Sequence, residues 1–379
     1  MILSNVEIIA KGLNDILISG NKISLISEKK INANTSLKIS FENAIAFPGL
    51  INSHDHLDFN NYPQLGNKTY TDYTDWAANI HTAFKETIEY VKKIPLALRI
   101  SWGVYKNLLN GVTTVINHGN KLKINYSPID VFQNCYSLHS VKFEENWKKS
   151  LINPFSKKIP FVMHAGEGVS DAASNEINEI IKWNFFNRKL IGVHGIAMNE
   201  QQAKNFCALV WCPVSNLFLF NRTANISVLK NYTKIIFGTD STLTANWNIW
   251  QHLREAQKQN MLSDKELFDS ITVNPALVWK LNEYGRLEKD FIADIVIAKK
   301  KSGDENLKSF FNVDPEDILV VIKNGEIKLA DESLAHYIIQ RKFSKIFVGN
   351  ACKYVEGNLQ QVVETFENNY QDIKLPITV

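Results

Sequence analysis

Two histidines separated by a single residue are the first feature of this sequence that could bind a metal ion. His54 and His56 stand in the segment PGLINSHDH, at the end of an apolar run. Because side chains two residues apart on a strand point to the same face, both imidazoles can reach one ion. An HxH pair alone is a weak sign, since solvated or core histidines are common, so its weight depends on further candidates.

Those candidates follow other apolar runs along the chain. His164 ends IPFVMH and would supply a third ligand, and Glu167 comes three residues later, near the ion without necessarily binding it. His194 ends LIGVH, and Asp240 follows KIIFGT. Any one of these residues could simply cap a strand or open a turn. Their repetition at the same end of successive strands favours a shared site over chance.

The segments that carry these residues alternate between strand-like and helix-like patterns. Between residues 47 and 284, short apolar runs are separated by amphipathic stretches such as 171–187 and 246–260. This alternation predicts parallel strands joined by helical crossovers. Each run ends in polar residues, which is typical of the carboxyl rim of a (β/α) barrel, where the chemistry of such folds is built. The repetition favours a barrel over an open sheet.

Both chain ends read differently, as short strands joined by tight turns. Alternating runs flank Gly20-Asn21 near the start and Asn324-Gly325 near the end, and each pair is a two-residue hairpin signal. A further apolar strand begins at Ala293. We therefore expect one small sheet domain built from both ends, with everything else inserted between them. Residues 358–368 have apolar positions at helical spacing, and we interpret the tail as a packing or subunit contact.

Composition narrows the class of protein without identifying it. The formal net charge of +3 is too small to indicate nucleic acid or an anionic membrane as partner. No signal peptide is apparent at the start, and no run of 18 or more apolar residues predicts a membrane span. The four cysteines form no CxxC pair, and we interpret them as buried thiols of a cytoplasmic protein.

The chain resembles the amidohydrolase superfamily, a group of metal-dependent hydrolases that includes deaminases and triazine hydrolases. The resemblance rests on the residues and the order of six segments: PGLINSHDH, GVTT, HAGE, VHG, CPVSN and GTDS. The resemblance extends to about residue 328. It implies an α/β fold with a distorted (β/α)8 TIM-type barrel and a small β-sandwich. The expected division is 1–46 and 286–330 for the β-sandwich, 47–285 for the barrel, and 331–379 for a C-terminal helical extension.

The same resemblance assigns roles to the candidate residues. The metal ligands of a mononuclear site match four residues: His54, His56, His164 and Asp240. Glu167 matches the glutamate of the HxxE motif, and His194 matches the histidine beside the metal-bound water. No lysine ends a middle barrel strand, where binuclear members carry a bridging lysine; Lys157 and Lys158 precede a strand instead. One divalent ion is therefore predicted, with zinc preferred and iron or manganese as alternatives.

These roles predict hydrolysis of a carbon–nitrogen bond. A bound metal lowers the pKa of its water from about 15.7 to roughly 7. We expect Asp240 to orient this water and take its proton, His194 to stabilise the developing negative charge, and Glu167 to protonate the substrate nitrogen. Deamination of a nitrogen heterocycle is the leading hypothesis. Hydrolysis of a cyclic or linear amide, or of a C–halogen or C–S bond, is the alternative. A non-catalytic ligand-binding barrel is the second alternative.

Residues that would hold the substrate are less well defined by the sequence. His118 ends GVTTVINH and His139 lies in CYSLHS, and each could contact a small-molecule substrate or be satisfied by backbone. Asn216 in CPVSN could contact the substrate, hydrogen-bond across the rim or orient a loop, and we favour the structural role. His81, His252 and His336 are predicted to lie on the surface, and the resemblance implies a homodimer or higher homo-oligomer.

One region departs from the pattern of the family. Only about forty residues, 120–158, separate the runs that end at His118 and at His164, where a full barrel requires two strand–helix units. CYSLHSVKF is the one clear strand in this region. Either one unit is strongly abbreviated or a barrel strand is missing.

Overall fold

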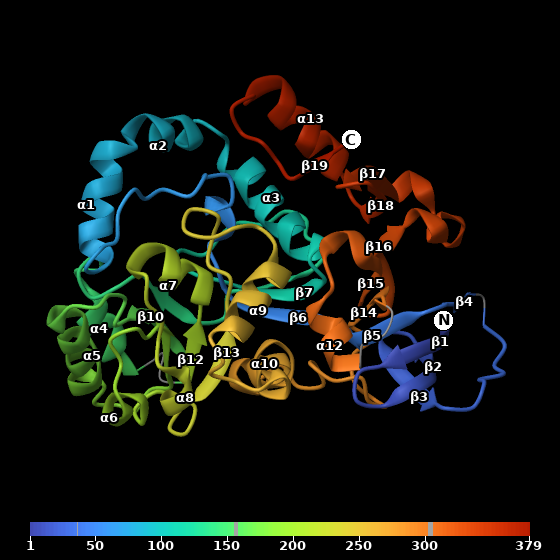
Figure 1. Cartoon of the computed structure of the whole chain (residues 1–379), viewed down its shortest axis with the longest axis horizontal. Coiled ribbons are helices and arrows are strands. Elements are labelled where there is room, and N and C mark those ends of the chain that lie inside the picture. The colour runs from blue at the N-terminus through green and yellow to red at the C-terminus, as the bar shows by residue number, and fades with distance from the viewer. Residues whose placement is uncertain (36, 155–157, 302–305) are drawn as a thin grey trace.

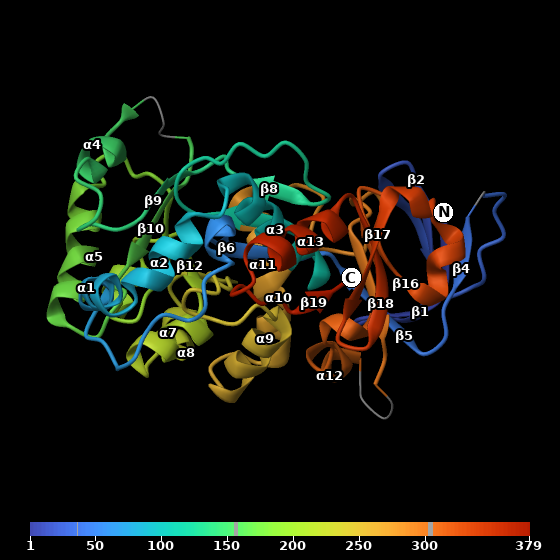
Figure 2. The same cartoon turned by 90° about the horizontal axis from the view of Figure 1, so that it is seen from above.

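The computed structural model describes residues 1–35, 37–154, 158–301 and 306–379. A large sheet occupies one side of the molecule, and a region of parallel strands alternating with helices occupies the other (Figure 1). Figure 2, the view from above, places these two regions side by side along the long axis. The predicted α/β class is confirmed by this alternation.

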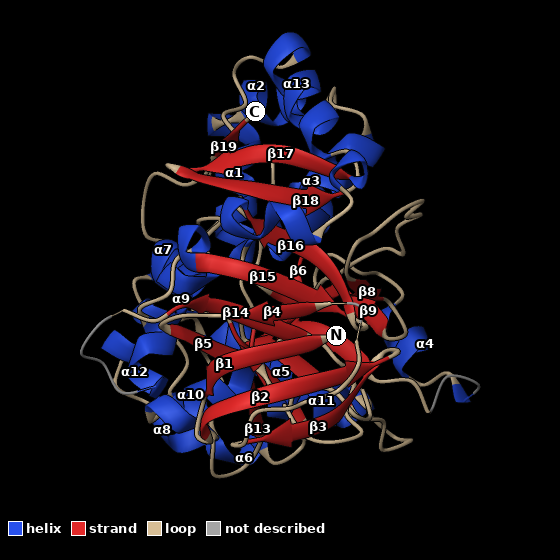
Figure 3. Ribbon diagram, turned by 90° about the vertical axis from the view of Figure 1, so that its right-hand side faces the viewer, coloured by secondary structure: helices blue, strands red, loops and turns tan. Residues whose placement is uncertain are grey.

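The large sheet contains strands from both ends of the chain (Figure 3). Its strands are β1 (Ile2–Ile8), β2 (Gly12–Ser19), β3 (Lys22–Ser27), β4 (Lys38–Ser40), β5 (Ala44–Pro48), β14 (Ile295–Lys299), β15 (Ile318–Lys323), β16 (Glu326–Asp331), β17 (Phe343–Val348), β18 (Ala351–Glu356) and β19 (Ile377–Thr378). The order is β19-β17-β18-β16-β15-β14-β5-β1-β2-β3, and β4 pairs with β1. The two chain ends join where β5 and β14 pair antiparallel.

Both predicted hairpins are present in this sheet. Strands β2 and β3 pair antiparallel around Gly20, and β15 and β16 pair around Asn324-Gly325. Gly20 has φ 57°, while Asn324 and Gly325 have φ 53° and 77°. Positive φ at these positions is what two-residue hairpin turns require, and glycine and asparagine adopt it most readily. The turn residues of the sequence therefore predicted both hairpins correctly.

Residues 331–379 are not the helical extension that we expected. Helix α13 (Leu359–Asn369) lies close to the predicted helix 358–368, but the same region adds β17, β18 and β19 to the large sheet. Strand β17 alternates buried and exposed positions along most of its length, as a half-buried strand does. Six residues of alternation are a weak signal beside a longer helical pattern, which explains the error.

The middle region holds parallel strands in two groups. One sheet contains β6 (Leu50–Asp55), β7 (Val112–Asn117) and β8 (Asp130–Phe132), and the other contains β9 (Tyr136–Leu138), β10 (Phe161–Ala165), β11 (Leu190–His194), β12 (Ala208–Trp211) and β13 (Lys234–Phe237). Apart from β8, β9 and one position of β13, these strands are buried throughout. Burial on both faces is typical of parallel strands that are covered by helices.

The two groups of parallel strands meet just beyond β6 and β13. The backbone N–H groups of Thr239 and Asp240 both donate to the carbonyl oxygen of His54, at 3.1 and 3.0 Å. Since Asp240 follows β13 and His54 lies on β6, these two bonds bring the candidate ligands of both sheets to the same edge.

Strands β8 and β9 explain the shortened region of the sequence. Strand β8 pairs with β7, and β9 pairs with β10, both in parallel. Three residues, 133–135, connect them, whereas returning the chain to start a second parallel strand takes a dozen residues or more. The two strands are therefore consecutive pieces of one strand position. Within the described residues, the middle region therefore has seven such positions.

Helices alternate with the parallel strands, and α12 (Asn306–Phe311) and α13 pack against the large sheet. The helices are α1 (Tyr73–Ala83), α2 (Lys85–Lys92), α3 (Leu96–Leu109), α4 (Trp147–Leu151), α5 (Asp171–Trp183), α6 (Glu200–Ala203), α7 (Pro213–Phe220), α8 (Ile226–Leu229), α9 (Ile249–Lys258), α10 (Asp264–Ile271), α11 (Val273–Trp279), α12 and α13, with 3-10 turns η1 (Leu57–Phe59), η3 (Pro315–Asp317), η4 (Glu332–Tyr337) and η5 (Gln340–Lys342). None of the helices in the described ranges is long and apolar enough to cross a membrane.

Candidate metal centre and active site

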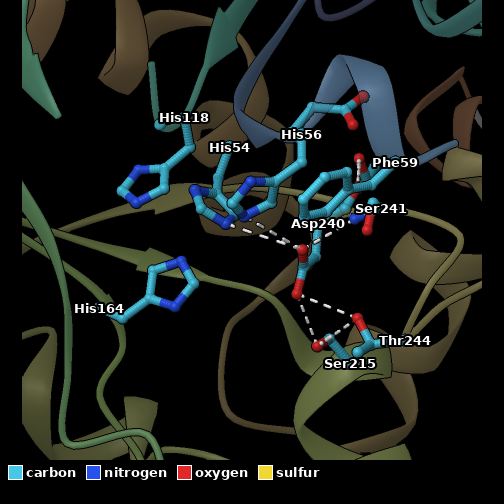
Figure 4. Close-up of polar contacts among 12 residues, drawn as sticks. His54, His56, Phe59, His118, His164, Ser215, Asp240, Ser241 and Thr244 are labelled. Carbon is cyan, nitrogen blue, oxygen red and sulfur yellow. Dashed lines mark hydrogen bonds and ion pairs between the residues drawn. The ribbon is translucent and has the colours of Figure 1, made fainter. Parts of the chain in front are cut away.

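The predicted metal ligands converge at the carboxyl ends of the parallel strands (Figure 4). His54 lies near the end of β6 and His56 follows it, His164 lies near the end of β10, and Asp240 follows β13. All four side chains are buried. Chain segments separated by almost two hundred residues thus place three imidazoles and one carboxylate in one site.

Distances between these side chains fit a single bound ion. Oδ1 of Asp240 lies 3.8 Å from Nε2 of His54 and 3.8 Å from Nε2 of His56. Ligand atoms of His54, His56 and His164 all lie within 4.8 Å of one another. Donor atoms that share a tetrahedral ion at bond lengths of about 2 Å lie at separations somewhat below these values, so a small contraction would complete the site.

The unpaired ring nitrogens of the site indicate which kind of group it could bind. Both ring nitrogens of His54, and Nε2 of His164 and His194, are buried without a hydrogen-bond partner in the described part of the chain. Buried imidazole nitrogens rarely remain unpaired in folded proteins. Nitrogen donors together with the Asp240 carboxylate are the ligand set that zinc prefers. The residues present therefore fit a divalent metal ion.

The backbone is strained where the site is built. His194 and Asp240 adopt φ of 70° and 57°, a left-handed conformation that non-glycine residues seldom occupy. Gly238 lets the strand pass close to the ligand, because a Cβ atom there would lie 2.7 Å from Cβ of His54. The GTD sequence thus combines a close approach with a turn that directs Asp240 inward.

Three neighbours hold the Asp240 carboxylate in place (Figure 4). Ser215 and Thr244 donate their hydroxyl groups to Oδ2 at 2.8 and 3.0 Å, and the backbone N–H of Ser241 donates to Oδ1 at 2.8 Å. Neither Ser215 nor Thr244 was predicted as a site residue, since serine and threonine in a helix or turn have no distinctive spacing. Oδ1 remains the oxygen directed at the metal-binding imidazoles.

Two carboxyl groups of the site have pKa values shifted in opposite directions. Burial raises the pKa of Glu167 well above its usual value, and the nearby Asp240 carboxylate adds to this effect. Burial would also raise the pKa of Asp240, but the imidazoles of His56 and His194 and the hydroxyl of Ser215 lower it below its ordinary value. The shifts therefore favour the protonated form of Glu167 and the ionised form of Asp240.

Glu167 contacts two histidines of the site. Its Oε2 lies 2.9 Å from Nδ1 of His164, and its Oε1 lies 3.6 Å from Nε2 of His194. The contact with Nδ1 leaves Nε2 of His164 directed at the metal position. The HxxE spacing thus orients one ligand and places a carboxyl group beside the reacting position.

Asn216 orients His194 and lies away from the cavity. Its Oδ1 lies 2.8 Å from Nδ1 of His194, and its Nδ2 donates to Thr223 Oγ1 at 3.1 Å. An amide oxygen only accepts, so Nδ1 of His194 carries the hydrogen and Nε2 presents its lone pair to the site. This geometry agrees with the structural role that we favoured for Asn216.

A cavity of about 410 Å³ opens above the metal position. Helices α1 and α2 cover one side of it through Trp76, Ile80 and Ile88. The remaining lining residues are His56, Asp58, Phe59, Tyr62, Ala77, His81, Lys92, Arg99, His139, Phe143, His164, Glu167, Asp240, Ser241, Leu243 and Thr244. Apolar atoms make up most of the cavity surface, and His56, His164, Glu167 and Asp240 lie at its metal end.

The two candidate substrate histidines differ in position. His139 lines the cavity, and burial lowers its pKa to about 4. His118 does not line it; its ring lies 4.7 Å from those of His54 and His164, and its Nδ1 lies 2.9 Å from Ser137 Oγ. The position of His118 thus favours a supporting role beneath the ligands over a contact with the substrate.

Of the three histidines expected on the surface, His81 and His336 are exposed. The prediction for His252 is wrong, because this residue is fully buried on α9 and its Nε2 lies 2.8 Å from the carbonyl oxygen of Asn246. Lys158 precedes β10, as predicted, and Lys157 lies outside the described residues. The single-metal expectation stays a prediction.

Comparisons with known proteins place this geometry in context. A sequence profile of the amidohydrolase family matches residues 155–328. The 5-methylthioadenosine/S-adenosylhomocysteine deaminase of Caldicellulosiruptor saccharolyticus is 26% identical, over 84% of this chain and 89% of that protein. The 5'-deoxyadenosine deaminase of Methanococcus aeolicus is 23% identical, over 91% of this chain and 99% of that protein.

Solved structures share the fold at low sequence identity. An adenosine deaminase from Xanthomonas campestris with bound zinc superposes with a TM-score of 0.69 and 14% identity, covering 87% of this chain and 92% of that one. A guanine deaminase from C. acetobutylicum with bound guanine gives a TM-score of 0.65 and 15% identity, covering 86% and 99%.

Proposed function

Because the chain belongs to the amidohydrolase superfamily, we propose that it is a metal-dependent aminohydrolase that removes an amino group from a nitrogen heterocycle by hydrolysis. The observation that carries this proposal is the convergence of three imidazoles and the Asp240 carboxylate beside Glu167, at the base of a 410 Å³ cavity. The two curated relatives are both named as deaminases of adenine nucleosides, which supports the same reaction class.

His54, His56, His164 and Asp240 are the proposed ligands of one divalent ion, and zinc is the preferred choice. Three nitrogen donors with one carboxylate suit zinc, and a solved relative of the same fold contains it. When bound, such an ion acts as a Lewis acid that activates water and polarises the substrate.

The chain's own residues supply the proton transfers. Asp240, held ionised, accepts a proton from the attacking water. His194, whose Nε2 presents a lone pair 4.0 Å from Oδ2 of Asp240, takes this proton over from Asp240, and the imidazolium stabilises the negative charge that develops on the substrate. Glu167, held protonated by burial, donates to the leaving nitrogen. The proton on His194 then passes to Glu167, whose Oε1 lies 3.6 Å from Nε2 of this histidine, and restores the acid that was consumed at the leaving nitrogen. Opposite pKa shifts of two neighbouring carboxyl groups are the pattern that assigns one as acid and the other as base.

An adenine nucleoside with an apolar group in place of the 5'-hydroxyl is the proposed substrate class. The names of the relatives include methylthioadenosine and deoxyadenosine. Apolar side chains such as Trp76, Ile80 and Ile88 line the cavity away from the metal end and would contact an apolar substituent. A volume of about 410 Å³ accommodates a ligand of this size.

Release of ammonia tests this proposal directly. The zinc-loaded protein would be incubated with adenosine, 5'-deoxyadenosine, 5'-methylthioadenosine, guanine, cytosine, a pterin and a triazine. Ammonia is expected from the adenine nucleosides, fastest from those lacking the 5'-hydroxyl. Hydrolysis of an amide or C–halogen bond without ammonia would replace the proposal with the alternative reaction. A protein that binds zinc but turns over none of a wide panel would support a binding function.

Finer points of the fold and setting also belong to this proposal. We propose that the two groups of parallel strands close into one distorted barrel of the (β/α)8 type, with a reduced unit at β8 and β9, beside a β-sandwich formed by the chain ends. The mild net charge and the free cysteines support a cytoplasmic enzyme whose partner is a small molecule. Size-exclusion chromatography with light scattering would test the expected homodimer or larger homo-oligomer.

A further inference from the structure

A buried ion pair lies directly beside the metal-binding histidines. Asp55, the residue between His54 and His56, is fully buried, and its Oδ2 lies 3.0 Å from Nζ of Lys106 on α3. Lys106 is only 2% exposed. We propose that Asp55 and Lys106 are positioning residues that hold the two imidazoles at the geometry the metal requires. This inference rests on the proposed metal site.

Asp55 is held by a complete set of hydrogen bonds. Its Oδ2 accepts from Nδ2 of Asn107 at 2.7 Å and from Nδ2 of Asn52 at 3.4 Å, in addition to Lys106. Its Oδ1 accepts from Nδ2 of Asn60 at 2.9 Å. A carboxylate with four donors has one orientation, so the backbone that carries both neighbouring imidazoles is fixed as well.

The same network reaches the segment that carries Asp240. Oδ1 of Asn60 accepts from Nζ of Lys106 at 2.8 Å and from the backbone N–H of Thr242 at 3.2 Å. Asn60 therefore links the ion pair to a residue two positions after the fourth ligand.

A second link runs through Asn52. Its Nδ2 donates to Oγ1 of Thr239 at 2.8 Å, and its Oδ1 accepts from the N–H of Thr239 at 3.1 Å. Ligands on β6 and after β13 belong to separate hydrogen-bonded sheets, so these side chains and the two bonds to the carbonyl of His54 fix their relative position.

Stability alone does not explain a charged pair at this place. Desolvating two ions costs several kcal/mol, and well-packed apolar residues of similar volume often stabilise a protein as much or more. The pair lies where α3 packs very closely on the segment that follows His56. A Cβ atom on Gly103 would lie 2.1 Å from the carbonyl oxygen of Leu57 in this segment. The directional hydrogen bonds of Asp55 and Lys106 hold the segment with His54 and His56 in one position. Apolar packing would define this position less specifically. Groups that orient metal ligands are typically worth 10- to 100-fold in metal affinity.

The test compares variants that remove one charge of the pair with a variant that removes both charges. Asp55→Asn and Lys106→Met would be made singly and together, and zinc affinity would be measured by competition with a chromogenic chelator, alongside the melting temperature. Each single variant should lose stability and bind zinc 10- to 100-fold more weakly. The double variant leaves no unpaired charge and should recover melting temperature, while its zinc affinity stays at least tenfold below that of the wild type.

A buried pair of the same kind in the large sheet provides the matched control. Lys353 is fully buried, and its Nζ lies 2.8 Å from Oδ2 of the nearly buried Asp331. Asp331→Asn and Lys353→Met should lower the melting temperature without changing zinc affinity. Equal loss of zinc affinity in this control would overturn the inference, since general destabilisation would then explain the effect.

Two further outcomes would also overturn it. One is wild-type zinc affinity in the single variants, and the other is full recovery of zinc affinity in the double variant. If the variants of Asp55 and Lys106 do not fold, Asn107→Ala provides a second test. It removes the 2.7 Å hydrogen bond to Asp55 without leaving a charge unpaired, and it should weaken zinc binding several-fold. Unchanged affinity there contradicts the inference. A wild-type protein that binds no zinc would instead refute the proposed function itself.

Discussion

Replacing Glu167 with Gln separates proton transfer from metal binding. Glutamine keeps the shape of the side chain, and its carbonyl oxygen can still accept from Nδ1 of His164, which lies 2.9 Å from the carboxylate. The orientation of that ligand is retained, so zinc content and affinity should match the wild type within about tenfold. The amide cannot donate a proton to a leaving nitrogen. Loss of a positioned acid costs about 10²- to 10⁴-fold in kcat, or about 2.7–5.4 kcal/mol at roughly 1.36 kcal/mol per tenfold.

The stability of this variant has a defined sign. Burial raises the pKa of Glu167, so burying its ionised carboxylate costs folding free energy in the metal-free protein. This cost is present above the unfolded-state pKa and vanishes at acid pH, and the neutral glutamine lacks it. The metal-free variant should therefore melt at pH 7 at the same temperature as the wild type or higher.

Three assays decide the outcome for Glu167→Gln. Ammonia release gives kcat, elemental analysis gives the zinc content, and calorimetry gives the melting temperature. Glu167→Ala provides the contrast, because it leaves Nδ1 of His164 buried without its acceptor and should weaken zinc binding as well. Turnover of Glu167→Gln within a few-fold of the wild type would refute the assignment of Glu167 as the proton donor.

Other variants test the supporting geometry. Asn216→Ala removes the acceptor of His194 Nδ1 and should cost about 1–3 kcal/mol of stability and lower kcat at unchanged zinc content; unchanged kcat would contradict the orienting role. Gly238→Ala places a Cβ atom 2.7 Å from Cβ of His54 and should cost about 1–3 kcal/mol and weaken zinc retention during dialysis against a chelator, and full retention would argue against it. Burial lowers the pKa of His139 to about 4, so this side chain is neutral above pH 5. His139→Asn should therefore raise KM and leave both limbs of the pH profile of kcat/KM unchanged between about pH 5 and 9. A shifted limb would show that His139 titrates in this range.

The sequence predicted that the candidate site residues lie together because each is at or just beyond the end of a buried strand. His164 and His194 end apolar runs that form β10 and β11, and the carboxyl ends of parallel strands share one edge. Strand patterns thus predicted which distant residues lie together, and the resemblance to the amidohydrolase superfamily supplied their expected roles.

Residues that support the ligands could not be found in this way. Ser215 lies in a helix and Lys106 on the buried face of α3, where their spacing matches that of ordinary helical residues. His252 was misplaced for a similar reason: α9 is mostly polar, but His252 shares a face with Ile249, Leu253 and Ala256, and its ring nitrogen is satisfied by backbone. Contacts made across the fold leave no periodic trace in the sequence.

The shortened region shows a limit of a different kind. Strands β8 and β9 have three residues each, so neither forms an apolar run of detectable length. Their common direction and short connection become visible only through pairing with β7 and β10. The sequence could therefore state only that one unit is abbreviated or that a barrel strand is missing.

X-ray diffraction from crystals of the zinc-loaded protein, recorded on both sides of the zinc absorption edge, tests the central claim most directly. The account predicts one anomalous peak at the carboxyl ends of the strands, bonded to His54, His56 and His164 at about 2.0–2.1 Å and to the Asp240 carboxylate. No peak at this position, or a peak that lacks contact with one of these four residues, would contradict it.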